Sequence, residues 1–460
     1  MKTTSEAAFE TAIEEVLLSR GYVKHASKEF NPELALFPEV ALSFIQTTQS
    51  KVWDKLEALH KEKTGERVIS ALCKWMDTHG VLTTLRHGFK CYGKTLRIAF
   101  FKPAHGLNPD LEARYGENIL GITRQLHFST KRPNDSLDVT LSVNGVPLAT
   151  LELKNPLTGQ TAANAIRQYR HDRDHREKIF DFKKRALVHF AVDTEEVHMT
   201  TRLAGGATHF LPFNRGRDGG AGNPEAKGRN YRTAYLWEEV LERHSFLDLL
   251  ARFLHLQVEE KRTDEGKRVK KETMIFPRYH QLRAVREMVE TSASEGTGHN
   301  YLVEHSAGSG KSNTIGWLAH RLSNLHNAKD ERVFDSVIVV TDRIVLDQQL
   351  QNTIYQFDHR QGVVEKIEEN SRQLAEALEN AVPIIITTLQ KFPFVSQQLL
   401  KMAEERGEER SHLPTRKCAV IIDEAHSSQS GETATDLKEV LGGEALREKA
   451  KELAEDEGES

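Results

Sequence analysis

The sequence predicts an α/β protein with two domains in succession, a mixed-sheet domain at residues 1–258 and a parallel-sheet domain at residues 274–460. A chain of 460 residues is too long for one ordinary domain. In the first half, helical patterns are mixed with a strand hairpin. In the second half, short β-branched runs alternate with helices, which is typical of a parallel sheet covered on both faces. Residues 259–273 are mostly charged and bury almost nothing, so we expect them to connect the two domains.

Apolar periodicity indicates the elements of the first domain. Phe9, Ile13 and Leu17 recur at helical spacing and Gly21 follows as a stop, which predicts an amphipathic opening helix. The further segments, in chain order, are a helical region at residues 38–76, strands within residues 95–104 and 138–155, a helix at residues 161–174, and strands within residues 186–201. Basic and acidic residues are interspersed over residues 167–178, and we interpret this run as a solvated helix face.

Four short β-branched runs predict the strands of the second domain. They lie at residues 301–305, 336–342, 382–389 and 418–423. A helix is expected after the first run, because Ile315, Leu318 and Leu322 fall on one face.

Composition excludes several classes of protein. A net charge of −4 with 28% charged residues describes an ordinary globular surface, so a nucleic-acid partner cannot be inferred from charge alone. The three cysteines show no paired spacing, which favours neither a zinc site nor a disulfide framework and fits a reducing compartment. The start lacks the apolar core of a signal peptide, and no apolar run approaches membrane-spanning length. We therefore expect a cytoplasmic protein without membrane contact.

The stretch "EHSAGSGKSNTI" has the context of a phosphate-binding loop. Gly308, Ser309 and Gly310 are small enough to let backbone N–H groups approach phosphates, and the next helix adds the favourable end of its dipole. Lys311 is expected to reach the β- and γ-phosphates, and Ser312 to hold Mg²⁺ through its hydroxyl. A histidine, residue 305, stands where the eight-residue pattern usually begins with glycine.

A second motif of nucleotide chemistry ends the run "CAVIID". Asp423 can bind the Mg²⁺ shell, and Glu424 can polarise the attacking water. The alternative, an acidic helix start, is weak because both motifs occur in the expected order, each expected at the end of a strand. The two motifs together predict binding of ATP with Mg²⁺.

A hairpin around Asn144-Gly145 poses a question of register. The apolar residues of both its strands have odd numbers: 137, 139, 141 and 143 in the first, and 149, 151 and 153 in the second. A two-residue loop pairs residue 143 with residue 146, which would turn the two apolar sets to opposite faces. We therefore expect either a three-residue loop with Gly145 left-handed or a β-bulge further along.

This change of register brings three polar residues to one face. Asp138 then lies opposite or diagonal to Glu152, with Lys154 nearby. Two carboxylates suit Mg²⁺, and an ammonium beside them can orient a water molecule and stabilise charge developing on phosphorus. Taken alone, the hairpin is better explained as a solvated charged face. The ATPase motifs in the same chain favour a site that cuts phosphodiester bonds.

The motifs together resemble a known family. Gln281 in "FPRYHQLRAV" stands where superfamily 2 helicases carry an adenine-reading glutamine, and "VVTDRIVLDQQL" and "IITTLQKF" are similar to further motifs of those proteins. With "FETAIEEVLLSRGY", "LDVTLSVNGVPLATLELKNP", "HSAGSGKSNTI" and "DEAHSSQSG", the chain resembles the N-terminal part of the restriction (R) subunit of type I restriction-modification enzymes. The resemblance implies a nuclease of the PD-(D/E)xK kind, followed by the first RecA-like lobe of a DNA translocase.

The resemblance also assigns roles to individual residues. The catalytic triplet of the family falls on Asp138, Glu152 and Lys154, although leucine precedes the aspartate where the family usually has proline. An acidic residue on the first helix is implied as well, for which Glu10 is preferred over Glu14.

Two further assignments follow from the same family motifs. Gln168 matches the first position of a Gln-x-x-x-Tyr element, although Asp172 stands where the family has tyrosine. In the DEAH motif, His426 joins the ATP-binding set.

The function that the resemblance implies is ATP-dependent endonuclease action on unmodified double-stranded DNA, with Mg²⁺ and ATP as cofactors. Modification (methyltransferase) and specificity subunits would be the partners. Family members continue into a second RecA-like lobe that supplies an arginine for ATP hydrolysis. Because the chain ends at residue 460, we expect it to be a truncated form that binds ATP with Mg²⁺ but hydrolyses it negligibly.

Two alternatives remain open from the sequence. One is a superfamily 2 DNA repair helicase with an inert N-terminal domain, which metal binding that depends on Asp138 and Glu152 would exclude. The other is a truncated remnant that only binds DNA or ATP, which metal-dependent cleavage would exclude.

Overall fold

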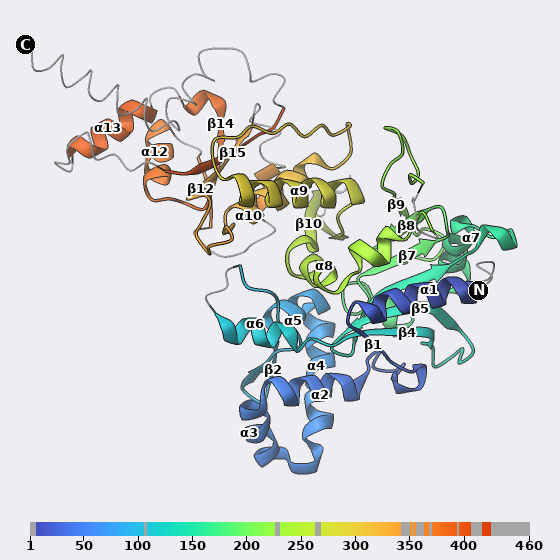
Figure 1. Cartoon of the computed structure of the whole chain (residues 1–460). Coiled ribbons are helices and arrows are strands. Elements are labelled where there is room, and N and C mark those ends of the chain that lie inside the picture. Colours follow the sequence, from blue (N-terminus) through green and yellow to red (C-terminus); the bar gives the residue numbers. More distant parts are fainter. Residues whose placement is uncertain are drawn as a thin grey trace, which may run out of the picture. The chain divides into compact units, whose positions relative to one another are not determined.

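A computed structural model describes most of residues 6–424. The described ranges are 6–104, 108–225, 231–262, 268–341, 350–351, 353–355, 363–367, 370–392, 395–405 and 416–424. The chain divides into two compact units, Met1–Tyr279 and His280–Ser460, and each is described here by itself. The first contains a mixed sheet and the second a parallel sheet, each with helices, which confirms the expected α/β class (Figure 1).

The main sheet of the first unit has seven strands in the order β1-β4-β5-β6-β7-β8-β9. It is mixed, because β1–β4 and β6–β7 pair in parallel and the other neighbours pair antiparallel. The strands are β1 (Tyr22–Lys24), β4 (Leu120–His127), β5 (Ser136–Val143), β6 (Val146–Leu153), β7 (Val188–Val192), β8 (Val197–Thr200) and β9 (Leu211–Pro212). Both central strands, β5 and β6, are buried along nearly their whole length.

The opening helix α1 (Glu6–Ser19) packs against β1, β4 and β6, with Phe9, Ile13 and Leu17 buried as expected (Figure 1). It ends before Gly21, whose φ of 86° is a conformation that glycine adopts without strain. After the hairpin in the chain, α7 (Ala162–Arg167) packs against β6 and β7 and continues into the π-helix η4 (Gln168–Asp172).

The remaining helices of the first unit lie partly in the predicted helical region at residues 38–76 and partly beyond it. They are α2 (Pro38–Thr48), α3 (Ser50–His60), α4 (Thr64–His79), α5 (Val81–His87), α6 (Pro109–Gly116) and α8 (Arg243–Asp248). The short turns are the 3₁₀ segments η1 (Ser27–Glu29), η2 (Lys61–Lys63), η3 (Pro156–Thr158) and η5 (Lys178–Phe180) and the π segments η6 (Leu236–Val240) and η7 (Leu249–Phe253). The strand expected within residues 95–104 is short: β3 (Lys94–Leu96) pairs with β2 (Phe89–Cys91), and the described residues 97–104 form no strand.

The charged segment at residues 259–273 forms a β-ribbon over its described part. Strands β10 (His255–Arg262) and β11 (Arg268–Ile275) pair antiparallel, and residues 263–267 lie outside the described residues. Opposite charges face each other at Glu259–Lys271 and Glu260–Lys270. Cross-strand charge pairs let a ribbon with little apolar surface hold its register.

The second unit contains a four-stranded sheet in the order β13-β14-β12-β15, and all three pairings are parallel. Its strands are β12 (Ser336–Thr341), β13 (Val364–Lys366), β14 (Ile384–Thr388) and β15 (Cys418–Ile422). Its described helices are α9 (Tyr279–Glu295), which begins with the last residue of the first unit, α10 (Lys311–Leu322), α12 (Ser371–Glu379) and α13 (Val395–Glu405), with a 3₁₀ turn η8 (Leu389–Lys391).

One expected strand of the second unit is absent. Residues 301–305 form no strand, and Tyr301, Leu302 and Val303 are exposed. An apolar run shows that a segment can form a strand, but a strand also needs a neighbouring backbone as hydrogen-bond partner. In the described sheet, β12 pairs with β14 and β15, and β14 pairs with β13, and none of these strands pairs with residues 301–305.

Among the helices that the structure describes, none combines the length and the apolar character needed to cross a lipid bilayer.

Candidate active site

A β-bulge sets the register of the hairpin between β5 and β6. The loop has two residues, Asn144 and Gly145, with φ of 49° and 82°, as in a type I′ turn. Val143 therefore pairs with Val146. Between Leu141 and Ser142 the register shifts, and from there Leu141 pairs with Ala149 and Val139 with Leu151. The bulge was one of the two solutions expected from the sequence, and it turns the apolar residues of both strands to the same face.

The shifted register places Asp138 opposite Glu152, one residue beyond the last pair, Val139–Leu151. Both carboxyl groups are buried, with exposed fractions of 9% for Asp138 and 0% for Glu152. A backbone donor fixes the first of them, because the Leu153 N–H donates to Asp138 Oδ2 over 2.7 Å. The interpretation of this hairpin as a solvated charged face is therefore wrong.

Glu152 has one satisfied and one free oxygen. Arg173 Nε donates to Glu152 Oε1 over 2.7 Å. No described residue donates a hydrogen bond to the buried Oε2. Burial, followed by the negative charge of Asp138, raises the pKa of Glu152 to about 8, although Arg173 and Lys154 oppose the shift. A buried carboxylate oxygen without a donor is costly, which makes this atom a natural ligand for a cation.

Lys154 follows β6 on the same alternation as Glu152. Its backbone N–H donates to the Val192 carbonyl, so the strand pairing with the neighbouring segment continues to this residue. The side chain is 8% exposed. Its Nζ lies 3.6 Å from Oε1 of Glu6 at the start of α1. The ammonium is thus held at the edge of the carboxylate pair.

Gln125 on β4 links the first helix to the triplet. Its Nε2 donates to Glu10 Oε1 over 2.8 Å and to Asp138 Oδ1 over 3.2 Å. The Ser136 hydroxyl donates to Gln125 Oε1 over 2.6 Å, which fixes the orientation of the amide. The described β4–β5 register skips Gln125, which has a φ of 47°. A non-glycine residue in this conformation within a strand is strained, and such strain is common at functional sites.

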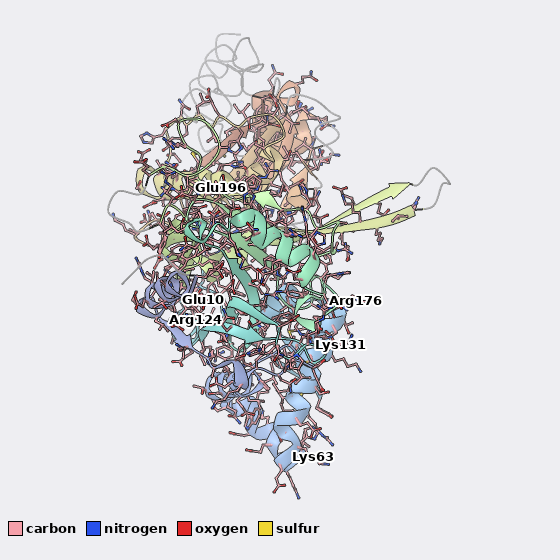
Figure 2. All side chains as sticks on the ribbon, turned by 90° about the vertical axis from the view of Figure 1, so that its right-hand side faces the viewer. Glu10, Lys63, Arg124, Lys131, Arg176 and Glu196 are labelled. Carbon is pink, nitrogen blue, oxygen red and sulfur yellow. The ribbon has the colours of Figure 1, made fainter. Side chains whose placement is uncertain are left out.

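The two candidate glutamates of α1 have different partners. Glu10 accepts from Arg124 Nε over 2.8 Å and from Gln125, and through Gln125 it is connected to Asp138. Figure 2 shows Glu10 beside Arg124. Glu14 instead pairs with Lys24 over 2.9 Å and lies 3.4 Å from Arg124. The described contacts thus connect Glu10 to the triplet and Glu14 to the end of β1.

Gln168 lies half-buried at the start of η4, and its carbonyl accepts a hydrogen bond from the Arg173 N–H. The next residue, Tyr169, is fully buried, and its hydroxyl lies 2.8 Å from Thr150 Oγ1 on β6. Asp172, the residue found in place of the family's tyrosine, is exposed. Tyr169 and Arg173 therefore connect the end of this helix to β6, the strand that carries Glu152.

Three residues of this site were not predicted from the sequence: Arg173, Arg124 and Gln125. Arg173 falls in the run interpreted as a solvated face, which is wrong at this position because the side chain is 8% exposed. Arg124 and Gln125 lie on β4, a strand that was not identified. The alternation of Leu120, Ile122 and Leu126 is the signal that would have revealed it.

The residues present fit a divalent cation of the Mg²⁺ type. Asp138 and Glu152 offer hard oxygen ligands from adjacent strands, and the free Glu152 Oε2 lacks any other described partner. Within the described residues, no group of three or more His, Cys, Asp or Glu is arranged around one point. Mg²⁺ usually takes one or two carboxylates and completes its shell with water and substrate phosphate, so two carboxylates suffice.

The raised pKa of Glu152 predicts a pH-dependent stability of the metal-free protein. Between the usual carboxyl pKa of about 4.5 and the folded value of about 8, the folded state binds more protons than the unfolded state. Stability is therefore highest below this window and falls as the pH rises through it. Glu152→Gln removes the titration, so the variant should be more stable than the wild type at pH 8, by a few kcal/mol at most, at about 1.4 kcal/mol per pKa unit.

Urea unfolding with EDTA at pH 5 and pH 8 measures this effect. Glu196→Gln is the control, since Glu196, labelled in Figure 2, has a 51% exposed side chain. A Glu152→Gln curve that still falls with pH as steeply as the wild type would show that Glu152 is ionised at both pH values.

The second unit positions a glycine loop before α10. Gly308 and Gly310 have φ of 72° and 87°, and Gly310 is the N-cap of α10. Gln281 is buried on α9, and its Nε2 donates to the Gly310 carbonyl over 2.9 Å. A Cβ at Gly310 would lie 2.6 Å from Gln281 Nε2 and would displace that side chain, and the φ of 87° also favours glycine here. The Ser309 hydroxyl is buried beside them.

Lys311 and the end of β15 meet in the second unit. The Lys311 Nζ lies 3.1 Å from Asp423 Oδ1 and also donates to Glu424 Oε1. Burial opposes the charge, but Glu424 and Asp423 together raise the pKa of Lys311. Ser312 follows on the first turn of α10. His426 lies outside the described residues.

Two family models match the chain. Residues 3–208 match the model described as type I restriction enzyme R protein N terminus, and residues 280–446 match the SWI2/SNF2 ATPase. The first match covers the carboxylate site, and the second covers the glycine loop, Lys311 and Asp423.

Curated relatives are endonuclease subunits of type I restriction enzymes. The HindI subunit from Haemophilus influenzae is 26% identical over 340 residues, which are 69% of this chain and 28% of the relative. The SauCOLORF180P subunit from Staphylococcus aureus is 23% identical over 297 residues, 64% of this chain and 28% of the relative. The putative MjaIXP subunit from Methanocaldococcus jannaschii is 24% identical over 338 residues, 66% of this chain and 28% of the relative. The chain thus spans about 28% of the length of these relatives.

Fold and site together define an α/β chain in which a mixed-sheet domain with a buried carboxylate pair precedes a parallel-sheet domain similar to the SWI2/SNF2 ATPase. The chain is similar to the N-terminal region of the R subunit of type I restriction enzymes, in agreement with the resemblance seen in its motifs.

Proposed function

We propose that this chain is the N-terminal part of a type I restriction endonuclease subunit, in which the first unit hydrolyses phosphodiester bonds of unmodified double-stranded DNA. The observation that carries the proposal is the buried pair Asp138–Glu152 with a free Glu152 Oε2. Buried carboxylates that have no cationic or hydrogen-bonding partner lower the stability of the fold. A site that only needed stability would be better filled with apolar side chains.

The side chains divide the work of hydrolysis between them. Asp138 and Glu152 would hold Mg²⁺, which, when bound, would neutralise charge on the scissile phosphate and make a water molecule more acidic. The Lys154 ammonium is held within 3.6 Å of Glu6 at the edge of the pair. From there it can orient the attacking water and stabilise the charge that develops on phosphorus. Glu10 and Gln125 keep the Asp138 carboxylate in place through their hydrogen bonds.

The second unit would supply ATP-driven movement along DNA in the longer protein. Lys311 would contact the β- and γ-phosphates, Ser312 and Asp423 would hold Mg²⁺, and Glu424 would polarise water. Gln281 would read adenine from α9, and Gly308, Ser309, Gly310 and His426 would complete the ATP site. The partners would be DNA and the modification and specificity subunits of the same system, in the cytoplasm.

Metal titration of the 460-residue chain without nucleotide tests the nuclease assignment. Calorimetry with Mn²⁺ should detect a site that is lost in Asp138→Asn and in Glu152→Gln. Asp135→Asn is the matched control, because Asp135 lies just before β5 and pairs only loosely with Arg132, 3.8 Å away. Wild-type Mn²⁺ binding by Asp138→Asn would refute the assignment and favour the alternative of a helicase with an inert first domain.

A further inference from the structure

Arg173 is the one described basic side chain that hydrogen-bonds directly to a carboxylate of the catalytic triplet. Its Nε donates to Glu152 Oε1 over 2.7 Å, and its NH2 group donates to the Ser136 carbonyl over 2.6 Å. The guanidinium carbon lies 5.8 Å from the centre of the Phe128 ring. The side chain is only 8% exposed. Three neighbours on separate segments thus hold one guanidinium in a single orientation.

A π-turn directs this arginine at the site. The Arg173 N–H donates to the carbonyl of Gln168, five residues earlier, at the end of η4. A π-turn contains one residue more than an α-turn, and such turns are rare but occur frequently at functional sites. This one ends at Arg173, whose backbone is extended with φ of −96° and ψ of 120°. The buried side chain of Arg173 reaches Glu152 from the end of the turn.

The hydrogen bonds of Arg173 determine which oxygen of Glu152 is available to bind a cation. Oε1 is taken by the guanidinium, and Oε2 has no donor among the described residues. Because the same guanidinium is tied to Ser136, two residues before Asp138, it also couples Glu152 to the start of the strand that carries Asp138. Hydrogen-bond partners of this kind orient metal ligands, and their loss typically weakens metal affinity by about 10- to 100-fold.

We propose that Arg173 is a positioning residue of the metal site: it holds the Glu152 carboxylate so that Oε2 faces a divalent cation shared with Asp138. The proposal rests on the proposed nuclease function. The competing role is that of a counter-ion, in which the arginine only offsets buried negative charge and repels a cation. The two roles predict opposite changes of metal affinity when the arginine is removed.

The test is calorimetric titration of Mn²⁺ into the 460-residue chain and its variants, without nucleotide. Arg173→Gln should bind Mn²⁺ about 10- to 100-fold more weakly than the wild type. Arg173→Lys keeps a cation but loses the planar fork, so it should recover only part of the affinity. The electron paramagnetic resonance spectrum of bound Mn²⁺ at saturation should change in both variants, because the geometry of its ligands changes.

Arg132→Gln is the matched control, since this arginine precedes β5 and its side chain is 59% exposed. It should bind Mn²⁺ like the wild type. Circular dichroism verifies the fold, and if Arg173→Gln does not fold, Arg173→Lys decides the question by the same measurements. Unchanged or tighter Mn²⁺ binding by a folded Arg173 variant would overturn the proposal. If Asp138→Asn also binds like the wild type, the nuclease assignment fails, whereas loss of binding in Asp138→Asn alone would refute only the role of Arg173.

Discussion

Lys154→Ala, introduced into the full-length subunit and assembled with its modification and specificity partners, is expected to abolish DNA cleavage while ATP hydrolysis continues. The substitution removes the ammonium beside Asp138 and Glu152, and the loss of one group that stabilises developing charge costs about 10²- to 10³-fold in rate. Its effect on the fold should be small, because its ion partner Glu6 is 36% exposed and the pair spans 3.6 Å. Double-strand breaks and ATP turnover are measured together on unmethylated DNA.

Lys131→Ala provides the comparison for this experiment. Lys131 is an exposed lysine of the same unit, in the loop before β5, and is labelled in Figure 2. It should leave both activities unchanged. Normal cleavage by Lys154→Ala would show that this lysine takes no part in the chemistry, and the nuclease assignment would lose its third residue.

Lys311→Ala is expected to abolish both ATP hydrolysis and cleavage in the same complex. Lys311 is the cation nearest to Asp423 and Glu424 among the described residues, and it provides the main contact to the γ-phosphate in our assignment. Removal of such an electrostatic contact typically lowers the rate of phosphoryl transfer by about 10²- to 10³-fold. Cleavage should fall as well, because cutting would follow ATP-driven movement along DNA.

The control for Lys311→Ala is Lys329→Ala, an exposed lysine after α10. Mn²⁺ binding at Asp138 and Glu152 should remain normal in Lys311→Ala, because both carboxylates belong to the other unit. Cleavage that persists in Lys311→Ala without ATP turnover would mean that the nuclease works independently of the ATPase.

The hairpin shows how much of the site follows from sequence. The odd numbering of apolar residues on both strands required a shift of register, and the bulge between Leu141 and Ser142 provides it. This inference succeeded because the apolar residues of both strands must pack on the same face, which leaves only one acceptable parity. The opening helix and the glycine loop could be located for similar reasons, since their signals are local in the chain.

Arg173 and Gln125 could not be assigned in the same way. The role of Arg173 depends on a π-turn, which adds one residue to a helix without a recognisable sequence signal. Gln125 has a φ of 47° within a strand. The surrounding fold imposes this conformation against the local preference of the chain. Both residues are placed by contacts between segments that are distant in the chain.

The segments at residues 259–273 and 301–305 show two opposite cases in which apolar content does not predict whether a strand forms. The first has little apolar content and yet its described residues form a paired ribbon, in which opposite charges face each other across the strands. The second has a strong apolar run and forms no strand. In each case the deciding factor is the partner backbone, which a single segment cannot reveal.

The bulge also determines which insertions and deletions this hairpin can accept. Leu148 has no cross-strand partner in the described β5–β6 register, and it is the residue that corrects the parity. Deleting Leu148 would remove the bulge and keep the pairs on both sides of it, from Val143–Val146 to Val139–Leu151, so Asp138 would still lie opposite Glu152. Adding one residue to β6 between the bulge and Glu152 has no such outlet and would need a second bulge to keep the two carboxylates together. The hairpin thus carries one spare residue, and it should tolerate the loss of a residue from this stretch better than the gain of one.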